Sequence, residues 1–338
     1  MEHMNNYQQI YAEIKAANKI AISSHRSPDG DSIGCSLGLY HFLLKLDKEV
    51  VVIHPDVAPL YLRWVKGSED MLYHDQDPSA VEEELGSADL LISVDYNAPD
   101  RVGFNLEPAI RRFSGRKVVI DHHLHPDLDF YDVVLSDTTA GSTSELIYKL
   151  IEASGNDTLL DSTIGTPLYL GIMTDTGSFR FPSMKPETHE ILARLMRAGV
   201  VHYDVHERVF DTNTVDRLKL RGYAISEKLE LIPDRPIAYM TLSQAELERF
   251  NYQKGDTEGL VNVALSVEGI KVAAFFAEKD GIVKISFRSK GEFVVNELAS
   301  DHFEGGGHKY AAGGISREGI LSAVEKFRSQ IDNYFPKK

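Results

Sequence analysis

The sequence predicts an α/β protein with two domains: an N-terminal domain built on a parallel sheet and a smaller C-terminal domain with a mixed α/β sheet, joined by a helical connector. Three observations support this prediction. The chain has 338 residues, about twice the length of an average domain. Its first half alternates short apolar runs with segments of helical periodicity. Its last third returns to strand-like runs after a charged stretch that lacks them.

The parallel sheet is expected from four short apolar runs, because strands that are buried on both faces show no polar alternation. Between and after these runs, Ser142-Thr143-Ser144-Glu145 predicts a capping box that opens a helix, and Gly155 is expected to close it. Pro186 and Gly199 bracket a further helix in the same way. The four runs are Ile20-Ala21-Ile22-Ser23-Ser24, Val50-Val51-Val52-Ile53, Leu90-Leu91-Ile92-Ser93-Val94 and Val118-Val119-Ile120.

The second half of the chain changes character twice. Residues 200–235 are charged and compatible with helix, and no strand-like run is expected there before Pro233. We therefore predict a first domain at residues 1–199, a connector at 200–235 and a second domain at 236–338. In the last of these, strands are expected at 237–240, 272–276 and 282–287, with helices near 243–250 and 320–334.

Composition restricts the partners of the protein. There are 36 Lys and Arg against 51 Asp and Glu, which gives a net charge of −15. Proteins that track long nucleic acid usually carry a basic surface, so long duplex DNA is an unfavourable partner, although a local basic pocket can still bind one or two phosphates. A single cysteine, Cys35, the lack of any run of membrane-span length and a polar, acidic start favour a cytoplasmic protein with no membrane partner.

Acidic and histidine side chains follow the ends of the predicted strands. In an open parallel sheet the carboxyl ends of the strands form the ligand crevice, so these side chains are expected to converge. A lone histidine at a sheet edge is usually hydrogen-bonded or solvated, and Asp31 or Asp175 could simply cap a helix. The occurrence of several such residues at the ends of successive strands favours a ligand-binding site over these separate explanations. The residues are His25, Asp29 and Asp31 after the first run, Asp95 after the third, Asp121-His122-His123 after the fourth, and Asp175 at the end of an apolar helical run.

Crowded carboxylates repel one another, and divalent cations relieve this repulsion. Four aspartates with two neutral histidines match the ligand preference of Mn²⁺ or Mg²⁺. Two such ions would offset four carboxylate charges and, at a separation of about 3.5–4 Å, can hold a hydroxide and clamp an in-line displacement at phosphorus. Gly30 is expected to let the backbone turn between Asp29 and Asp31.

A second group of polar residues is expected in the C-terminal domain. Arg288-Ser289 ends a predicted strand, and Gly305-Gly306-Gly307-His308 lies in a predicted loop. Consecutive glycines can expose backbone N–H groups as an anion nest, and arginine supplies a forked donor for phosphate. From these residues alone, an anion site and a plain turn beside a solvated Arg288 are equally open.

Taken in order, these motifs resemble those of the DHH phosphoesterases. The matching residues are His25-x-x-x-Asp29-x-Asp31, Asp95, Asp121-His122-His123 and Asp175-Thr176-Gly177. The segment Arg288-Ser289 with Gly305-Gly306-Gly307-His308 resembles the signature of the DHH-associated C-terminal domain, and the chain is most similar to the NrnA-like nano-RNase and pAp (3′-phosphoadenosine 5′-phosphate) phosphatase branch.

The resemblance implies a hydrolase with two Mn²⁺ ions, for which Mg²⁺ is the alternative. It implies that Asp121 orients the histidine pair from behind and that His123 contacts the scissile phosphate or helps to protonate the leaving oxygen. The implied ligands of one metal are His25, Asp29 and Asp95, and those of the other are Asp31, Asp95, His122 and Asp175. The implied substrate-binding residues are Arg288, Ser289, Gly305, Gly306, Gly307 and His308.

The function expected from the resemblance is hydrolysis of short oligoribonucleotides from one end and of pAp, through attack of a metal-activated hydroxide on phosphorus. The alternative is a phosphodiesterase for cyclic di-AMP or its linear product pApA. A pyrophosphatase, a polyphosphatase and a non-catalytic nucleotide-binding protein are less favoured. The sequence leaves the oligomeric state open and is compatible with a homodimer.

Overall fold

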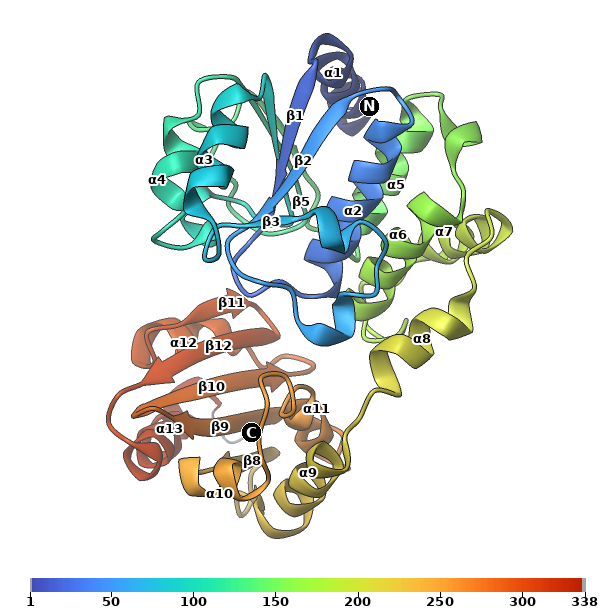
Figure 1. Ribbon diagram of the computed structural model, residues 1–338. Helices are drawn as coiled ribbons and strands as arrows, with labels where there is room; N and C mark the ends of the chain where they lie inside the picture. The colour runs from blue at the N-terminus through green and yellow to red at the C-terminus, as the bar shows by residue number, and fades with distance from the viewer. Residues whose placement is uncertain (1, 336–338) are drawn as a thin grey trace. The chain divides into compact units, whose positions relative to one another are not determined.

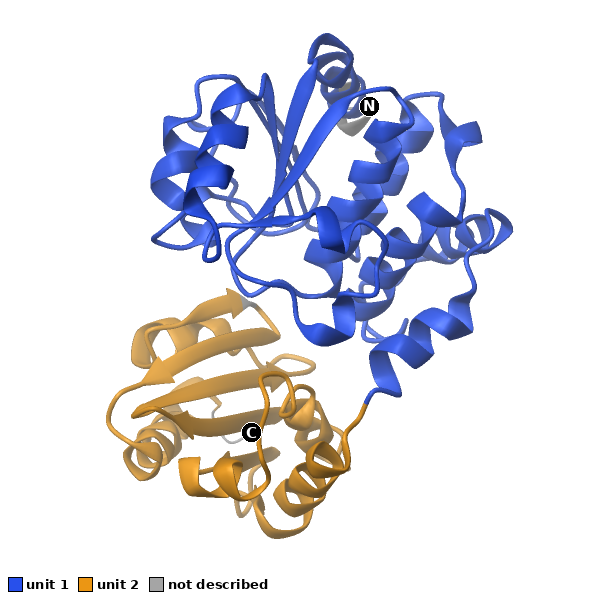
Figure 2. Ribbon diagram, viewed as in Figure 1, with its two compact units in different colours: residues 1–212 blue, residues 213–338 orange. Residues whose placement is uncertain are grey.

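The computed structural model describes residues 2–335, apart from the side chains of residues 2–5 and 308, and divides into two compact units (Figures 1 and 2). Unit 1 is Met1–Thr212 and unit 2 is Asn213–Lys338. Each unit has its own sheet and its own apolar core. The predicted fold class, a parallel-sheet domain followed by a smaller mixed-sheet domain, is confirmed.

The sheet of unit 1 has six strands, all parallel, in the order β3-β2-β1-β4-β5-β6. The chain leaves β1 towards one edge of the sheet and returns to pair β4 with the other side of β1, so the strand order reverses between β1 and β4. Ligands bind at such a switch point in open parallel sheets. The strands are β1 (Lys19–Ser23), β2 (Glu49–His54), β3 (Leu72–Tyr73), β4 (Leu90–Val94), β5 (Arg116–Asp121) and β6 (Val133–Ser136).

Helices cover both faces of this sheet (Figure 1). Alternate strand residues enter two separate cores: Ile20 and Ile22 pack with α1, α2, α5 and α6, whereas Ala21 packs with α3 and α4. This explains why the strands lack polar alternation. The helices of unit 1 are α1 (Glu2–Ala16), α2 (Gly30–Leu44), α3 (Pro78–Ser87), α4 (Glu107–Arg112), α5 (Thr143–Ala153), α6 (Ser162–Asp175), α7 (Pro186–Arg197) and α8 (His202–Phe210), with short 3₁₀ turns η1 (Leu60–Leu62), η2 (Ser68–Asp70), η3 (Pro99–Val102) and η4 (Asp157–Leu159).

Helices α2 and α6 are packed unusually closely. A Cβ at Gly34 of α2 would overlap the backbone of Pro167 and Gly171 in α6, so only glycine permits this approach. The pair runs antiparallel, because Gly30 faces Thr174 at one end and Gly38 faces Leu168 further along. The close packing places the start of α2 beside the end of α6.

The predicted helix boundaries in unit 1 are confirmed, with one correction. Ser142 caps α5 by accepting a hydrogen bond from the N–H of Glu145, and Gly155 follows the helix with a φ of 74°. The reciprocal half of the capping box is missing, because the Glu145 carboxylate is buried and instead accepts hydrogen bonds from Thr188, Lys149 and the N–H of Gly141.

Unit 2 contains a six-stranded mixed sheet in the order β11-β12-β10-β9-β8-β7, in which only β8 and β9 pair in parallel. Its strands are β7 (Leu229–Leu231), β8 (Ile237–Leu242), β9 (Val272–Lys279), β10 (Ile282–Ser289), β11 (Gly306–His308) and β12 (Ala311–Ser316). Its helices are α9 (Val215–Glu227), α10 (Gln244–Arg249), α11 (Leu260–Leu265), α12 (Asn296–His302) and α13 (Ile320–Tyr334).

Two expectations for the second half were wrong. The stretch 200–231 was expected to lack a strand, but Leu229–Leu231 forms β7, which pairs with β8 at one edge of the sheet. The glycine-rich segment was expected to be a loop, but Gly306–His308 forms β11 at the opposite edge. Both strands are three residues long and gain their hydrogen bonds by pairing with the next strand along the chain, so neither contains a run long enough to mark it as a strand.

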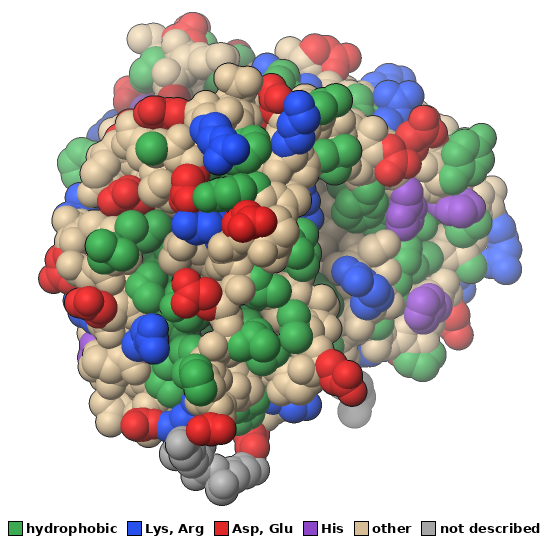
Figure 3. Space-filling model, turned by 90° about the horizontal axis from the view of Figure 1, so that it is seen from below, with side chains coloured by type: hydrophobic (Ala, Val, Ile, Leu, Met, Phe, Trp, Pro, Cys, Tyr) green, Lys and Arg blue, Asp and Glu red, His purple; other side chains and the backbone are tan. Residues whose placement is uncertain are grey.

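Within residues 2–335, no helix combines the length and the apolar character needed to cross a bilayer. On the face drawn in Figure 3, Lys and Arg side chains are scattered among acidic and apolar ones.

Candidate active site

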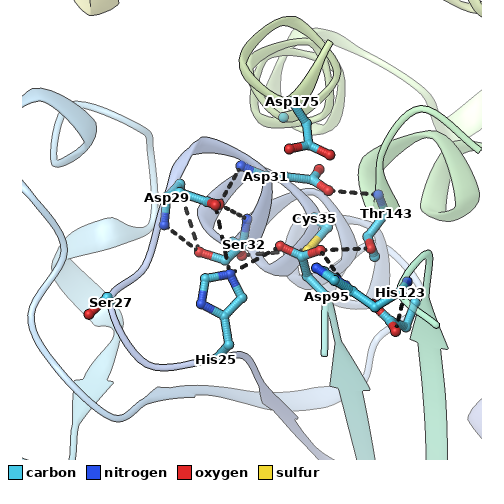
Figure 4. A network of polar contacts seen from close by, with 12 residues as sticks. His25, Ser27, Asp29, Asp31, Ser32, Cys35, Asp95, His123, Thr143 and Asp175 are labelled. Atoms are coloured by element: carbon cyan, nitrogen blue, oxygen red, sulfur yellow. Dashed lines mark hydrogen bonds and ion pairs between the residues drawn. The ribbon is translucent and has the colours of Figure 1, made fainter. Parts of the chain in front are cut away.

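The acidic and histidine side chains predicted for unit 1 come together at the carboxyl edge of its sheet (Figure 4). In each of three groups, one ligand atom per residue lies within 4.8 Å of the others. Two of these groups share Asp95. The groups are His25, Asp29 and Asp95; Asp31, His122 and Asp175; and Asp95, His122 and His123.

The first group lies in the loop after β1. The Nε2 atom of His25 is 3.3 Å from Oδ2 of Asp95 and 3.8 Å from Oδ2 of Asp29. The other ring nitrogen, Nδ1, lies 2.9 Å from the carbonyl oxygen of Arg26. A hydrogen bond to this carbonyl fixes the tautomer so that Nε2 presents its lone pair to a metal.

The second group joins three distant parts of the chain. The Nε2 atom of His122 lies 3.3 Å from Oδ2 of Asp175, at the end of α6. Asp31, in the first turn of α2, completes the group and is 1% exposed. The close packing of α2 against α6 brings Asp31 and Asp175 to the same place.

Asp95 stands between the two groups. Its Oδ2 atom faces His25, while its Oδ1 atom lies 3.6 Å from Nε2 of His122. The residue has a φ of 63°, the left-handed region that is unfavourable for residues other than glycine. Such strain persists only where the surrounding structure enforces it, and it is common at functional sites.

Asp29 rather than Asp31 caps α2. The Oδ1 atom of Asp29 accepts hydrogen bonds from the N–H groups of Asp31 and Ser32, each at 3.0 Å, and the Ser32 hydroxyl accepts one from the N–H of Asp29. Capping and metal binding are compatible, because the cap uses Oδ1 whereas Oδ2 faces His25. The alternative that Asp31 is merely a cap was wrong.

The reason expected for Gly30 was also wrong. Gly30 lies inside α2 and is not among the glycines with positive φ, so no unusual turn requires it. A Cβ at this position would overlap the side chain of Thr174, so Gly30 is needed for the approach of α6.

The carboxylates of this cluster are electrostatically unfavourable in the metal-free protein. Burial raises the pKa of Asp31 and of Asp95 to about 6, and for Asp95 the charge of Asp31 adds to the effect. Burial and the neighbouring carboxylates also raise the pKa of Asp175 well above its usual range. Among the described side chains, no Lys or Arg forms an ion pair with Asp29, Asp31, Asp95 or Asp175.

The histidines partly compensate for this negative charge. Burial lowers the pKa of His25, but its hydrogen bond to Asp95 and the charges of Asp29 and Asp95 outweigh burial and raise it to about 9. In the metal-free protein, an imidazolium at His25 therefore occupies the place of a cation. A metal ion that binds there must displace this proton.

Asp121 and His123 form a separate pair behind the cluster. The carboxylate of Asp121 is fully buried and accepts hydrogen bonds from Nδ1 of His123 at 2.6 Å and from its N–H at 3.0 Å. Burial lowers the pKa of His123, but this hydrogen bond and the charges of Asp121 and Asp95 raise it above the ordinary value. These contacts are those expected if Asp121 orients the ring of His123, and the role of His123 towards the substrate stays a prediction.

The donor set fits a pair of hard or borderline dications. Four carboxylates and two imidazoles suit Mn²⁺ or Mg²⁺, and two dications would balance the four carboxylate charges that no Lys or Arg compensates. The grouping of ligand atoms also fits two ions that share Asp95.

In unit 2, the predicted substrate-binding residues lie on or beside β10 and β11, the two strands that flank β12. Arg288 of β10 and His308 of β11 are both in register with Ala311 of β12, so they occupy corresponding positions on either side of a small residue. Burial lowers the pKa of Arg288, and within the described part of the chain its guanidinium bonds only to the carbonyl oxygen of Phe287. A largely buried cation without a carboxylate favours an anionic ligand.

The other residues of this group differ in what surrounds them. The hydroxyl of Ser289 donates a hydrogen bond to the carbonyl oxygen of Phe293 and so holds the turn after β10. A Cβ at Gly305 or Gly307 would overlap the backbone of β12, whereas Gly306 has open space around it. The role predicted for the His308 side chain lies outside what the structure describes.

Sequence reasoning placed Thr143 and Ser144 in a helix cap and did not assign either residue to the site. At the first turn of α5, their N–H groups donate hydrogen bonds to Asp31 at 2.6 and 3.0 Å, and the Thr143 hydroxyl donates one to Asp95 at 3.0 Å. The feature of the sequence that could have revealed them is the apolar run Val133-Val134-Leu135-Ser136, which forms β6. Had that strand been recognised, the start of α5 would have been placed at the same edge as the aspartates.

Comparison with known proteins agrees with the motifs. The model of the DHH family, N-terminal domain, matches residues 19–172, and that of the DHHA1 domain matches residues 234–337. A protein named probable bifunctional oligoribonuclease and PAP phosphatase NrnA, from Streptococcus mutans, is 31% identical over 93% of this chain and 94% of its own length.

Two further comparisons are informative. The cyclic-di-AMP phosphodiesterase GdpP of Bacillus subtilis is 28% identical over 95% of this chain but only 49% of its own length. The crystal structure titled an exopolyphosphatase-related protein from Bacteroides fragilis superimposes with a TM-score of 0.94 and 37% identity, over 98% of this chain and 97% of that one. The resemblance inferred from the motifs is confirmed.

Proposed function

Because this chain belongs to the DHH family of phosphoester hydrolases, we propose that it hydrolyses short oligoribonucleotides and pAp with two bound Mn²⁺ ions. The observation that carries the proposal is the pair of neighbouring ligand groups His25–Asp29–Asp95 and Asp31–His122–Asp175, because Oδ1 of Asp95 in the first lies 3.6 Å from Nε2 of His122 in the second. The relative that matches nearly full length is named for these two activities.

Bound at these two groups, dications would lower the pKa of water and neutralise charge on the phosphate. His25, Asp29 and Asp95 would hold one ion, and Asp95, Asp31, His122 and Asp175 the other. Asp95 directs one carboxylate oxygen to each group, which suits a bridging ligand.

His123 is proposed to protonate the leaving oxygen. The Nδ1–H of His123 donates a hydrogen bond to Asp121, which fixes the orientation of the ring. The other ring nitrogen, Nε2, is then the atom proposed to act on the substrate. Asp121 and Asp95 stabilise the imidazolium by their charge, so a proton is present on the ring at higher pH than in an ordinary histidine. The same arrangement serves phosphomonoesters and phosphodiesters.

We further propose that unit 2 binds the substrate through Arg288, the backbone amides of Gly305, Gly306 and Gly307, and the residues Ser289 and His308. The support is chemical: the partly buried guanidinium of Arg288 has no carboxylate partner among the described residues, and Arg288 is in register, across β12, with the glycine-rich edge strand β11. Small nucleotides fit a chain with a net charge of −15 better than long duplexes do. The homodimer and the cytoplasmic location expected from the sequence stay predictions.

The test compares initial rates of metal-stripped protein, with and without added Mn²⁺, on a diribonucleotide, pAp, cyclic di-AMP, pyrophosphate and a 24-residue RNA. Fast turnover of the diribonucleotide and pAp, with slow turnover of the long RNA, supports the proposal. Dominant hydrolysis of cyclic di-AMP would instead support the second candidate, although the chain spans only about half the length of that relative. Equal rates without metal would contradict the two-metal proposal.

A further inference from the structure

Thr143 contacts both carboxylates that lie at the centre of the metal-ligand cluster. Its backbone N–H donates to Oδ2 of Asp31 at 2.6 Å, and its hydroxyl donates to Oδ1 of Asp95 at 3.0 Å. Figure 4 shows Thr143 reaching both from the start of α5. All three residues are almost completely buried, so water does not compete for these hydrogen bonds.

The hydroxyl bond matters because Asp95 needs a defined orientation. To serve two ions, its carboxylate must direct Oδ2 towards His25 and Oδ1 towards His122, at 3.3 and 3.6 Å. The donor on Oδ1 is Thr143, and rotation of the carboxylate would break that bond. The left-handed backbone conformation of Asp95 fixes the direction in which its side chain leaves the backbone. The hydrogen bond from the Thr143 hydroxyl fixes the rotation of its carboxylate.

The backbone bond acts on the other side of the cluster. Asp31 receives two N–H groups from the first turn of α5, from Thr143 and from Ser144, which is the positive end of the helix dipole. These bonds favour the ionised carboxylate and oppose the effect of burial on its pKa. Thr143 is thus the one described residue that bonds to a ligand of each group.

We propose that Thr143 is a positioning residue that orients the bridging carboxylate of Asp95 and thereby couples the binding of the two metal ions. This inference rests on the proposed two-metal function. Hydrogen-bond partners of metal ligands commonly change metal affinity by about 10–100-fold when removed. The consequence here is specific: loss of the Thr143 hydroxyl weakens the second ion to bind and reduces formation of the paired centre.

The test is a titration of metal-stripped protein with Mn²⁺. Calorimetry measures the affinity for each ion, and electron paramagnetic resonance distinguishes exchange-coupled ion pairs from isolated ions. Thr143→Val removes the hydroxyl at nearly constant volume, and Thr143→Ser keeps it. The matched control is Thr139→Val, because Thr139 is an exposed threonine in the same segment whose hydroxyl bonds to Asp137. Thermal melting of each metal-free variant shows that it is folded.

We expect Thr143→Val to weaken binding of the second Mn²⁺ by about 10-fold or more and to lose most of the coupled signal. Thr143→Ser and Thr139→Val should behave as the wild type. Unchanged affinity and coupling in Thr143→Val would overturn the inference while leaving the proposed function intact. Wild-type protein that binds no Mn²⁺ would overturn both. If the valine variant does not fold, Thr143→Ala, which leaves more room, is measured in its place with the same expected result.

Discussion

The two units carry their functional groups in different ways. In unit 1, charged side chains from separate strands and helices crowd into one buried cluster, and the cost is visible in the raised pKa values of Asp31 and Asp95. In unit 2, the guanidinium of Arg288 on β10 has no carboxylate partner among the described residues, and β12 separates it from the glycine-rich edge strand β11. The first arrangement suits hydrolysis of a phosphoester, and the second suits binding of the anionic substrate.

The difference also separates residues by what their replacement should change. A side chain in the cluster of unit 1 supplies a charge or a metal ligand, so its replacement by one of similar size should affect metal binding and rate. For a glycine in unit 2, the effect of replacement depends on the space around its Cα. Where an added Cβ would meet backbone, packing should suffer, and where it would meet open space, ligand binding should change instead. The following experiments test this contrast.

The largest effect is expected for Asp95→Asn. This change keeps the size of the side chain but removes the charge that the two ligand groups share, so Mn²⁺-dependent hydrolysis should fall on the order of 1000-fold or more. Steady-state rates and metal titration measure the loss. The control is Asp129→Asn, an exposed aspartate of unit 1 outside the cluster. Retention of wild-type turnover in Asp95→Asn would contradict the assignment of the bridging ligand.

A smaller effect of another kind is expected for Arg288→Ala. Loss of a charged hydrogen-bond donor should raise KM by about 10–100-fold and leave Mn²⁺ affinity unchanged. Lys284→Ala is the matched control, because Lys284 lies four residues earlier on β10 and is exposed on the same face of the strand. If both variants raise KM equally, Arg288 contributes only general positive charge.

The glycines of unit 2 should divide according to their surroundings. Gly305→Ala places a Cβ against the backbone of Gly313, so the melting temperature should fall. Gly306→Ala meets open space, so stability should be unchanged, while KM rises a few-fold because the methyl group occupies the proposed ligand space. Thermal melting and KM of both variants give the comparison. Wild-type KM in a stable Gly306→Ala variant would argue that the ligand does not approach this strand.

The smallest effect is a pH dependence of stability in the metal-free protein. The pKa of His25 is raised to about 9, so its proton stabilises the fold below the ordinary histidine pKa and this contribution is lost as pH rises towards 9. The carboxyls of Asp31 and Asp95, with pKa values raised to about 6, disfavour the fold once they ionise. Both effects lower the stability of the metal-free fold as pH rises.

The melting temperature of metal-stripped protein should therefore fall between about pH 5 and 9 by a few degrees. Because Mn²⁺ takes the place of the lost protons, the stabilisation it provides should grow over the same interval. Melting curves with and without Mn²⁺ measure both trends. The metal-free slope should be shallower in Asp95→Asn, and an equally steep slope in that variant would assign the pH dependence to other groups.

Sequence determined much of unit 1. The apolar runs, the residues that end them and the order of the motifs were sufficient to predict the parallel sheet and to gather His25, Asp29, Asp31, Asp95 and Asp175 at one edge. The physical reason is that a buried parallel strand needs a continuous apolar run, and the carboxyl ends of such strands point the same way. The ends of the four predicted strands could therefore be located from local sequence, whereas β3 and β6 were not predicted.

Only the tertiary structure decided how these residues are held. Thr143 contacts Asp31 and Asp95, although it is separated from them by 112 and 48 positions, and Gly30 serves the packing of α6 rather than a turn. Local sequence fixes which side chains are present and where strands can form, whereas hydrogen bonds and close contacts between distant segments depend on the packed arrangement of the whole unit.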